Sequence, residues 1–191
     1  MPELMIVYER QNMIVNVRRR RMNTKKNLSH CIKIRPITIE DYETVLKWSK
    51  DDAFCTANGW DINRSPKELY RWWLNCVNLE SNDFIRMGIE FNEKLIGYAD
   101  LACMKDNSTE IGIAIGESKL WGKGIGSNSV MLMMEYASRE FEITTFKAET
   151  HEENIRSRKM LEKIGFKEVS RFGSEEYLGM TSQLIQYCLK F

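Results

Sequence analysis

Three glycines at alternate positions, Gly122, Gly124 and Gly126, form the part of this sequence best suited to chemistry. They stand between an alternating apolar segment, Thr109 to Gly116, and a helical pattern that starts at Ser127. Glycine adopts positive φ angles at little cost, and the free amides at a helix N-terminus attract anions. The segment is therefore predicted to cradle a phosphate group, and a diphosphate would fit it.

The residues beside these glycines do not match the two common nucleotide-binding patterns. The dinucleotide fingerprint G-x-G-x-x-G needs a glycine where Ser127 stands. A P-loop needs Ser or Thr directly after its lysine, whereas Lys123 is followed by Gly124. NAD and ATP are therefore weaker candidates than another ligand that carries a diphosphate.

The segments around the loop alternate between strand-like and helical patterns, and these elements must position it. Period-two alternation predicts strands over residues 31–37, 84–91, 94–104, 109–116, 142–150, 167–171 and 177–189. Helical spacing, with start signals at Thr38 and in Ser65-Pro66-Lys67-Glu68, predicts helices over residues 38–49, 65–78, 127–141 and 153–164. Residues 54–64, which include Trp60, are expected to form a loop, and Asn92-Glu93 a tight hairpin turn.

This element order, β-α-α-β-β-β-α-β-α-β-β, predicts an α/β fold with one mixed sheet. Because helices separate strands that cannot all be hairpins, they should cover both faces of that sheet. In the helix after the glycine loop, Val130, Met133, Met134, Ala137 and Phe141 recur at core spacing. These methionines are therefore expected to be core residues.

Length and composition favour one compact domain in the cytoplasm. The chain has 191 residues, of which 43% are hydrophobic, as in an ordinary soluble protein. Its five cysteines are scattered without a C-x-x-C pair, which indicates reduced thiols, and two histidines are too few for a histidine-rich metal site. No apolar run reaches the roughly 18 residues of a spanning helix, and Glu3, Glu9 and Arg10 interrupt any signal-peptide core, so no membrane association is expected.

Residues 1–28 are expected to be an extension ahead of a domain at residues 29–191. The net charge is only +1, yet six cations lie close together here, Arg18–Arg21 with Lys25 and Lys26, so the rest of the chain is mildly acidic. No aromatic residue lies among them, which favours a solvated linker over a nucleic-acid-binding segment. Residues 4–8 and 13–17 are β-prone and could pair as an edge hairpin or exchange with a partner chain in a homodimer, and both alternatives stay open.

Three separate motifs become specific when their spacing is considered together. They are Ile111 to Ile115 leading into Trp121-Gly-Lys-Gly-Ile-Gly126, then Asn154-Ile-Arg-Ser157, and then Glu162-Lys-Ile-Gly-Phe166. On these motifs and its element order, the sequence from residue 31 to 189 resembles the GNAT family of acetyl-CoA-dependent N-acetyltransferases. The resemblance implies the GNAT fold with its central, mostly antiparallel sheet. It also implies acetyl-CoA as co-substrate, no metal, and a primary amine as acceptor.

The resemblance also implies a branch within the family. Trp121 departs from the family's Gln or Arg, but Trp-Gly-x-Gly also occurs in the branch that acetylates N-terminal residues of ribosomal proteins. Ile34-Arg-Pro-Ile-Thr, Glu40-Asp41 and Trp48 look like that branch too. The favoured acceptor is therefore a protein or peptide N-terminus, which would attack directly through a tetrahedral intermediate. A small amine such as a polyamine or aminoglycoside is one alternative, and a non-catalytic acyl-CoA sensor is another.

By the same resemblance, backbone amides of the glycine loop hold the diphosphate, and the strand before it holds the pantetheine arm. The implied acetyl-CoA-binding residues are Ile113, Ala114, Ile115, Trp121, Gly122, Lys123, Gly124, Ile125, Gly126, Ser127, Asn154 and Ser157.

Several carboxylates could serve as the catalytic base. Glu110 is preferred, because members of the family often place a carboxylate at this point of the strand, although an exposed edge glutamate would look the same. Asp100 is the second candidate, with a hydrogen-bonded structural aspartate as its alternative. Glu149 and His151 end the strand at 142–150 near the expected cleft, where a lone histidine is more often simply exposed.

The general acid is harder to assign. Many relatives use a tyrosine in the helix before Gly-Phe, and the matching position here is Leu161. Ser157 is the remaining candidate, because its hydroxyl could hydrogen-bond the coenzyme A thiol or relay its proton, with simple packing or capping as the alternative.

An aromatic group is expected to form the acceptor wall, since Trp60, Trp72 and Trp73 fall in the segment that does so in such enzymes. Adjacent Trp72 and Trp73 cannot both face the core, so one of them should line the cleft. Asp51, Asp52 and Asp61 could attract a cationic amine, although solvated loop acids are the simpler account.

Overall fold

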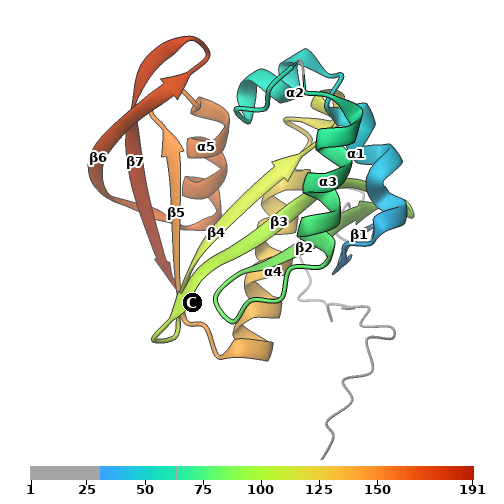
Figure 1. Cartoon of the computed structure of the whole chain (residues 1–191). Coiled ribbons are helices and arrows are strands. Elements are labelled where there is room, and N and C mark those ends of the chain that lie inside the picture. The colour runs from blue at the N-terminus through green and yellow to red at the C-terminus, as the bar shows by residue number, and fades with distance from the viewer. Residues whose placement is uncertain (1–30, 63) are drawn as a thin grey trace, which may run out of the picture.

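The structure is a computed structural model that describes residues 31–62 and 64–191. One seven-stranded sheet crosses it in the order β1-β2-β3-β4-β5-β7-β6 (Figure 1). Its strands are β1 Ile32–Pro36, β2 Ile85–Phe91, β3 Lys94–Lys105, β4 Ser108–Ile115, β5 Thr145–His151, β6 Lys167–Tyr177 and β7 Met180–Lys190. The extension predicted for residues 1–28 lies outside the described residues.

Helices cover both faces of this sheet, as the sequence predicts. The α-helices of the described chain are α1 Tyr42–Trp48, α2 Asp52–Ala57, α3 Pro66–Val77, α4 Ile125–Phe141 and α5 Ile155–Ile164, with short 3-10 turns η2 Ile39–Asp41 and η3 Ser118–Leu120. Helices α1 and α3 lie on one face, and α4 and α5 on the other (Figure 1). The α/β class and the mostly antiparallel sheet are confirmed.

The sheet divides between β4 and β5, its parallel pair. These strands pair only where Ser108–Glu110 meets Thr145–Lys147. Beyond that contact they diverge, so that β4 continues with the β1–β3 half and β5 with the β6–β7 half (Figure 1). The edges of β4 and β5 therefore face a gap in the sheet above residues 110 and 147, where their backbone groups are free of each other.

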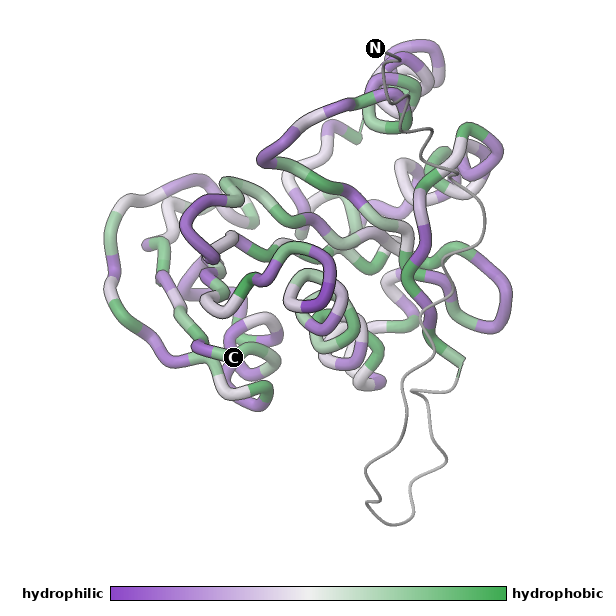
Figure 2. The backbone as a smooth tube through the Cα atoms, turned by 90° about the horizontal axis from the view of Figure 1, so that it is seen from below, coloured by the Kyte–Doolittle hydropathy of each residue, from purple (hydrophilic) through white to green (hydrophobic). Residues whose placement is uncertain are grey.

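Two apolar clusters hold the helices against the sheet. On the α4 side, Met133 and Met134 are fully buried against β-strand residues such as Ile89 and Leu101, which confirms the predicted methionine core. On the other side, α1 and α3 bury Trp48 and Trp73. Along the tube in Figure 2, the helices accordingly alternate between hydrophobic and hydrophilic residues.

Phe141, predicted to be a core residue of α4, is 39% exposed. It is the last residue of the helix, where the chain leaves the sheet, and its ring rests edge-on against Tyr136 at 5.8 Å.

The expected loop over residues 54–64 is wrong at its start, because α2 occupies Asp52–Ala57. The Asp51 side chain caps this helix by accepting a hydrogen bond from the Phe54 amide at 3.1 Å. Phe54 itself is buried in the core. One capping aspartate and one core aromatic are thus enough to make a short helix that periodicity cannot detect in six residues.

Positive φ angles also shift the predicted start of β5 and the predicted division between β6 and β7. Strand β5 starts at Thr145 rather than at Glu142, since α4 runs to Phe141 and Glu142 ends it in the left-handed region (φ 55°). Tyr177 belongs to β6, because Leu178 (φ 54°) and Gly179 (φ 76°) form the two-residue turn that follows. The hairpin turn predicted at Asn92-Glu93 is confirmed, with φ of 50° and 64°.

Candidate active site

The glycine loop leads directly into α4, two residues earlier than predicted. Gly122 (φ 74°) and Gly124 (φ 82°) have positive φ, and Gly124 is the N-cap of the 17-residue helix. Gly126 lies within the helix, and a different feature favours glycine there. A Cβ atom at this position would lie 3.0 Å from Sδ of Met160 on α5. The glycines therefore open the first amides of α4 to a ligand and let α4 approach α5 closely.

This helix N-terminus lies at a cleft of about 620 Å³ between the diverging strands. The cleft gathers residues from the segments of the first two motifs, with Lys163 from the third: Ile113, Ala114, Ile115, Trp121, Gly122, Gly124, Gly126, Ser127, Asn154, Ser157 and Lys163. Two predicted members do not line it. The Lys123 side chain points to solvent, and the Ile125 side chain is buried in the core, so Ile125 offers only its backbone.

Arg156 is a cleft residue that the sequence reasoning missed. Its guanidinium carbon lies 3.7 Å from the ring centroid of Trp121, while the Trp121 Nε1 atom donates to the carbonyl of Ile115 at 2.8 Å. Burial lowers the pKa of Arg156, yet the group stays charged at neutral pH. A cation therefore stands beside the glycine loop even though Trp121 has replaced the Gln or Arg of the motif. The Asn-x-Arg-Ser spacing contained this signal, because residue 156 lies between two predicted cleft residues.

The start of α5 carries the two polar cleft residues of the second motif. Asn154 caps the helix, since its Oδ1 atom accepts from the Ser157 amide at 3.2 Å. This cap leaves the Asn154 side-chain nitrogen available to a ligand. The Ser157 hydroxyl makes no hydrogen bond within the described chain.

The structure separates the candidate bases. Glu110 is exposed, sits opposite Lys147 at the last paired position of β4 and β5, and lies outside the residues that line the cleft. Glu149 lines the cleft two residues further along β5, where the strands have parted. Its Oε2 atom accepts a hydrogen bond from Gln186 Nε2 at 2.7 Å. Glu149 is therefore the better placed and better oriented of the two carboxylates.

His151 also lines the cleft, on the same face of β5 as Glu149. Its ring stacks on Tyr177 with centroids 4.5 Å apart and an angle of 18°. The Nδ1 atom of His151 is buried without a hydrogen-bond partner in the described structure. Tyr177 is buried as well, and this burial raises the pKa of its hydroxyl. The histidine is thus held by stacking, not merely exposed at a strand end.

Asp100 has the structural role that was its alternative, so its prediction as a base is corrected. Arg86 Nε and Nη2 donate to its two carboxylate oxygens at 2.8 and 2.6 Å. The same guanidinium packs 4.3 Å above the Tyr98 ring, and burial raises the pKa of that tyrosine to about 12. Both oxygens of Asp100 are therefore occupied by a cation.

The predicted tryptophan wall is also corrected. Trp73 is fully buried and its Nε1 atom donates to the Thr38 carbonyl at 2.9 Å, so it is a core residue. Trp72 is covered instead by Arg64 and Arg86, whose guanidinium carbons lie 5.2 and 5.4 Å from its ring centroid. Trp60 packs edge-on against Trp72, and all three tryptophans lie outside the lining of the cleft.

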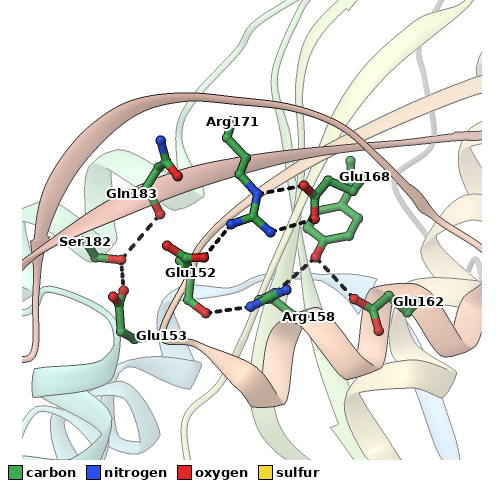
Figure 3. Close-up of polar contacts among 9 residues, drawn as sticks. Glu152, Glu153, Arg158, Glu162, Glu168, Arg171, Ser182 and Gln183 are labelled. Carbon is green, nitrogen blue, oxygen red and sulfur yellow. Dashed lines mark hydrogen bonds and ion pairs between the residues drawn. The ribbon is translucent and has the colours of Figure 1, made fainter.

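A polar network fixes the turn between β5 and α5, behind the cleft (Figure 3). Arg158 donates to the Glu152 carbonyl at 3.1 Å and to the Tyr187 hydroxyl at 3.3 Å. Arg171 of β6 bridges Glu152 and Glu168, and Ser182 of β7 donates to Glu153. The network ties the start of α5 to the β6–β7 hairpin, and it thereby positions the cleft residues that precede and follow this turn.

Among residues 31–62 and 64–191, no group of three potential metal ligands of the His, Cys, Asp or Glu type comes together. The described helices are likewise all too short or too polar to span a membrane.

A mixed sheet that divides beside a glycine-lined helix N-terminus is the architecture of an acyltransferase class. The chain belongs to the acetyltransferase (GNAT) domain family, a family of acyltransferase enzymes, whose model matches residues 32–167.

Two curated relatives show sequence similarity. An uncharacterized protein of Methanocaldococcus jannaschii is 32% identical over 149 residues, covering 76% of this chain and 30% of the relative. The alpha/beta-tubulin-N-acetyltransferase 9 of Mus musculus is 24% identical over 151 residues, covering 76% of this chain and 54% of the relative. The chain thus spans about a third and about half of the length of these relatives.

Solved structures share the fold at lower identity. A ribosomal-protein alpha-N-acetyltransferase, RimL, in complex with coenzyme A superposes with a TM-score of 0.75 at 16% identity, covering 86% of this chain and 96% of that one. A spermidine N-acetyltransferase from Vibrio cholerae, in complex with CoA and spermine, has a TM-score of 0.72 at 18% identity, covering 84% and 96%. These likenesses establish the fold.

Proposed function

We propose that the chain transfers the acetyl group of acetyl-CoA to a primary amine, and that this amine is the N-terminus of a polypeptide. One observation carries the first half of the proposal. Residues of three motifs spread between positions 111 and 166 line a single cleft at the division of the sheet, with the N-terminus of α4 open to it. An acetyl thioester supplies the activated acyl group, and the chain has to bind it, orient it and handle two protons.

The residues present fit acetyl-CoA. The first amides of α4 and the guanidinium of Arg156 are donors for its diphosphate. Their positive charge complements the negative charge of the diphosphate. The unpaired edge of β4 at Ile113–Ile115 offers backbone groups to the pantetheine arm and to the thioester oxygen. Asn154 adds a side-chain amide.

We assign the base to Glu149 in place of Glu110. A base must be within hydrogen-bond reach of the proton that it accepts, and Glu149 is the carboxylate that faces the cleft at the diverging strands. Gln186 binds one of its oxygens, which leaves the other for the amine proton or for an intervening water. Ser157 is the donor for the departing thiolate, because Leu161 has no proton to give and is buried.

The charges at the cleft support a single-amine acceptor over a polyamine. Its carboxylates are Glu149 and Glu175, whereas its cations are Arg156, Lys159 and Lys163. Asp51, which was expected to attract a cationic amine, is occupied as the cap of α2 and accepts from the Ser118 amide at 3.2 Å. With two carboxylates against three cations, the cleft suits an acceptor with one ammonium group better than an acceptor with several. The tubulin and ribosomal-protein acetyltransferases among the similar proteins act on polypeptides by name, which agrees with this choice.

The first test measures acetyl-CoA-dependent mass gain in a mixed panel of N-terminal peptides, polyamines and aminoglycosides. Acetylation of peptides alone is the expected outcome. Transfer to spermidine alone would reject the polypeptide acceptor and keep the reaction. Tight binding of acetyl-CoA without transfer to any member would favour a sensor.

The second test compares Glu149→Gln with Glu110→Gln, a matched loss of one carboxylate from the same face of the neighbouring strand. Loss of a general base lowers kcat by about 100-fold or more. We expect that loss for Glu149→Gln with an unchanged KM for acetyl-CoA, and less than about threefold for Glu110→Gln. The reverse pattern would return the role to Glu110.

Five free cysteines, Cys31, Cys55, Cys76, Cys103 and Cys188, support a reducing compartment, and we propose the cytoplasm as the location of this activity.

A further inference from the structure

Helix α5 carries four cations that fall on two different sides. Arg158 belongs to the network behind the cleft, where it is bound by the Glu152 carbonyl and the Tyr187 hydroxyl (Figure 3). Arg156, Lys159 and Lys163 line the cleft instead, and none of them forms an ion pair with a carboxylate of the described residues. The cation on one side of this helix is thus hydrogen-bonded within the protein. The three cations on the other side have no carboxylate partner.

These three cations line the same cleft as the N-terminus of α4. Met160 marks the contact, since its Sδ atom would lie 3.0 Å from a Cβ placed on Gly126. Arg156 precedes Met160 by one helical turn, Lys159 is its neighbour, and Lys163 follows three residues later. Positions 159 and 163 lie one turn apart, with a rise of about 6 Å, on one side of the helix. The anion-attracting end of α4 and the cations of α5 therefore form one continuous positive region.

The diphosphate of acetyl-CoA does not use all of this charge. Under the proposed function, the α4 amides and Arg156 bind the diphosphate, and Arg156 is already held beside the glycine loop by Trp121. Lys159 and Lys163 remain, and together they match the charge of a dianionic phosphate monoester. The carboxylates that line the cleft do not cancel them, because Glu149 lies on β5 bound to Gln186 and Glu175 lies on β6. Glu162 of α5 contacts Tyr187 on the other side of the helix.

We propose that Lys159 and Lys163 bind the 3′-phosphate on the ribose of coenzyme A, so that the domain selects coenzyme A over its dephosphorylated form. The inference rests on the proposed function, because it takes the diphosphate to lie at the α4 N-terminus. It adds a recognition site for a third phosphate group, formed by two lysines of α5, of which Lys163 belongs to the third motif and Lys159 to none of the three.

The test measures the Kd of coenzyme A and of 3′-dephospho-coenzyme A for the full chain by titration calorimetry. A charge-assisted contact to a phosphate corresponds to about tenfold in affinity, so wild type should bind coenzyme A at least about tenfold more tightly. The double variant Lys159→Met, Lys163→Met should bind both ligands equally, at the wild-type affinity for the dephosphorylated one. The wild-type preference should also shrink as salt is raised from about 0.05 to 0.5 M.

Lys167→Met is the matched control, since Lys167 is an exposed lysine near the end of α5 that lies outside the cleft lining. It should keep the full preference. Equal binding of the two ligands by wild type, or an undiminished preference in the double variant, would overturn the inference while leaving the proposed function intact. Failure of wild type to bind either ligand would overturn the proposed function, and this inference with it.

Discussion

Two charged side chains of the cleft, Glu149 and Arg156, are each held in their orientation by a neighbouring side chain. Gln186 binds Glu149, and is itself fixed by the Ser170 hydroxyl at 2.9 Å and the Phe172 carbonyl at 2.8 Å. Trp121 supports Arg156 in the same way through its ring. Gln186 and Trp121 can therefore be replaced while Glu149 and Arg156 keep their charges. Such variants test the effect of orientation apart from the effect of charge.

Replacing Gln186 by leucine should lower kcat by about tenfold, because Glu149 loses the donor that orients it. A hydrogen bond to a charged group contributes about 1.5 kcal/mol, which corresponds to that factor. The KM for acetyl-CoA should not change, since Gln186 is outside the cleft lining. Steady-state kinetics with Gln183→Leu, an exposed residue of the same strand, provides the control. An equal loss in both variants would mean that β7, and not the contact to Glu149, was disturbed.

Replacing Trp121 by alanine should raise the Kd for acetyl-CoA by about threefold to fivefold, because Arg156 loses a cation–π contact of about 0.5–1 kcal/mol. Trp121→Phe keeps a ring but loses the bond from Nε1 to the Ile115 carbonyl, so it should fall between wild type and alanine. Calorimetric titration distinguishes these cases. If phenylalanine were as weak as alanine, the indole hydrogen bond and not the stacking would hold the loop.

At the scale of elements, strand β4 can approach α1 only because residue 116 has no side chain. A Cβ on Gly116 would lie 2.1 Å from the Trp48 ring, which is fully buried, whereas a Cβ on Gly112 would meet its nearest atom at 3.8 Å. Gly116→Ala should therefore destabilise the fold by about 2 kcal/mol, as overpacking does. Gly112→Ala, the matched change on the same strand face, should be nearly neutral. Urea unfolding measures both, and equal stabilities would show that Trp48 can move freely.

The cap of α2 makes stability depend on pH. The hydrogen bond from Ser118, aided by the amide of Phe54, lowers the pKa of Asp51 below its ordinary value. A lowered folded-state pKa stabilises the fold above the unfolded pKa of about 3.9, and this contribution disappears as pH falls through the folded value. Asp51→Asn should thus cost about 0.5–1 kcal/mol at pH 7, as for a charge at a helix N-terminus, and almost nothing near pH 2.5.

Urea unfolding of the Asp51→Asn variant at the two pH values measures that difference. Asp106→Asn, in the exposed β3–β4 turn, is the control for removing a carboxylate that caps no helix. A cost for Asp51→Asn that persists at the acidic pH would assign the effect to geometry instead of charge.

The elements that the sequence predicts well are those with a local signature. The capping box at Ser65 and Glu68 forms as expected, with the Glu68 amide donating to Ser65 Oγ at 3.2 Å. Helix α2 was missed because six residues are less than two turns. The end of β6 was missed because Leu178, a residue that gives no turn signal, takes a positive φ there. Such features depend on the tertiary environment and not on local propensity.

At the scale of the molecule, the cleft could be assembled from sequence only as far as motifs identify its members. The glycine loop and the start of α5 were found in this way. The choice between Glu110 and Glu149 depends on where two strands diverge, and the burial of Trp73 depends on how α3 packs on the sheet. Residue spacing in the sequence predicts neither feature. Arg156 and Gln186 were missed because their roles exist only through contacts with distant residues.

The two halves of the sheet meet through a short strand contact and through α4 against α5, and a ligand in the cleft touches both halves. Acetyl-CoA at 100 times its Kd should therefore stabilise the fold by about 2.7 kcal/mol and raise Tm by about 5–10 °C. Hydrogen exchange should slow most at the amides of residues 113–115 and 125–127, and least at the tip of the β6–β7 hairpin. The Gly124→Asn variant, which tolerates the positive φ but fills the cradle, should show neither effect. A rise in Tm without protection of these two segments would place the ligand elsewhere on the molecule.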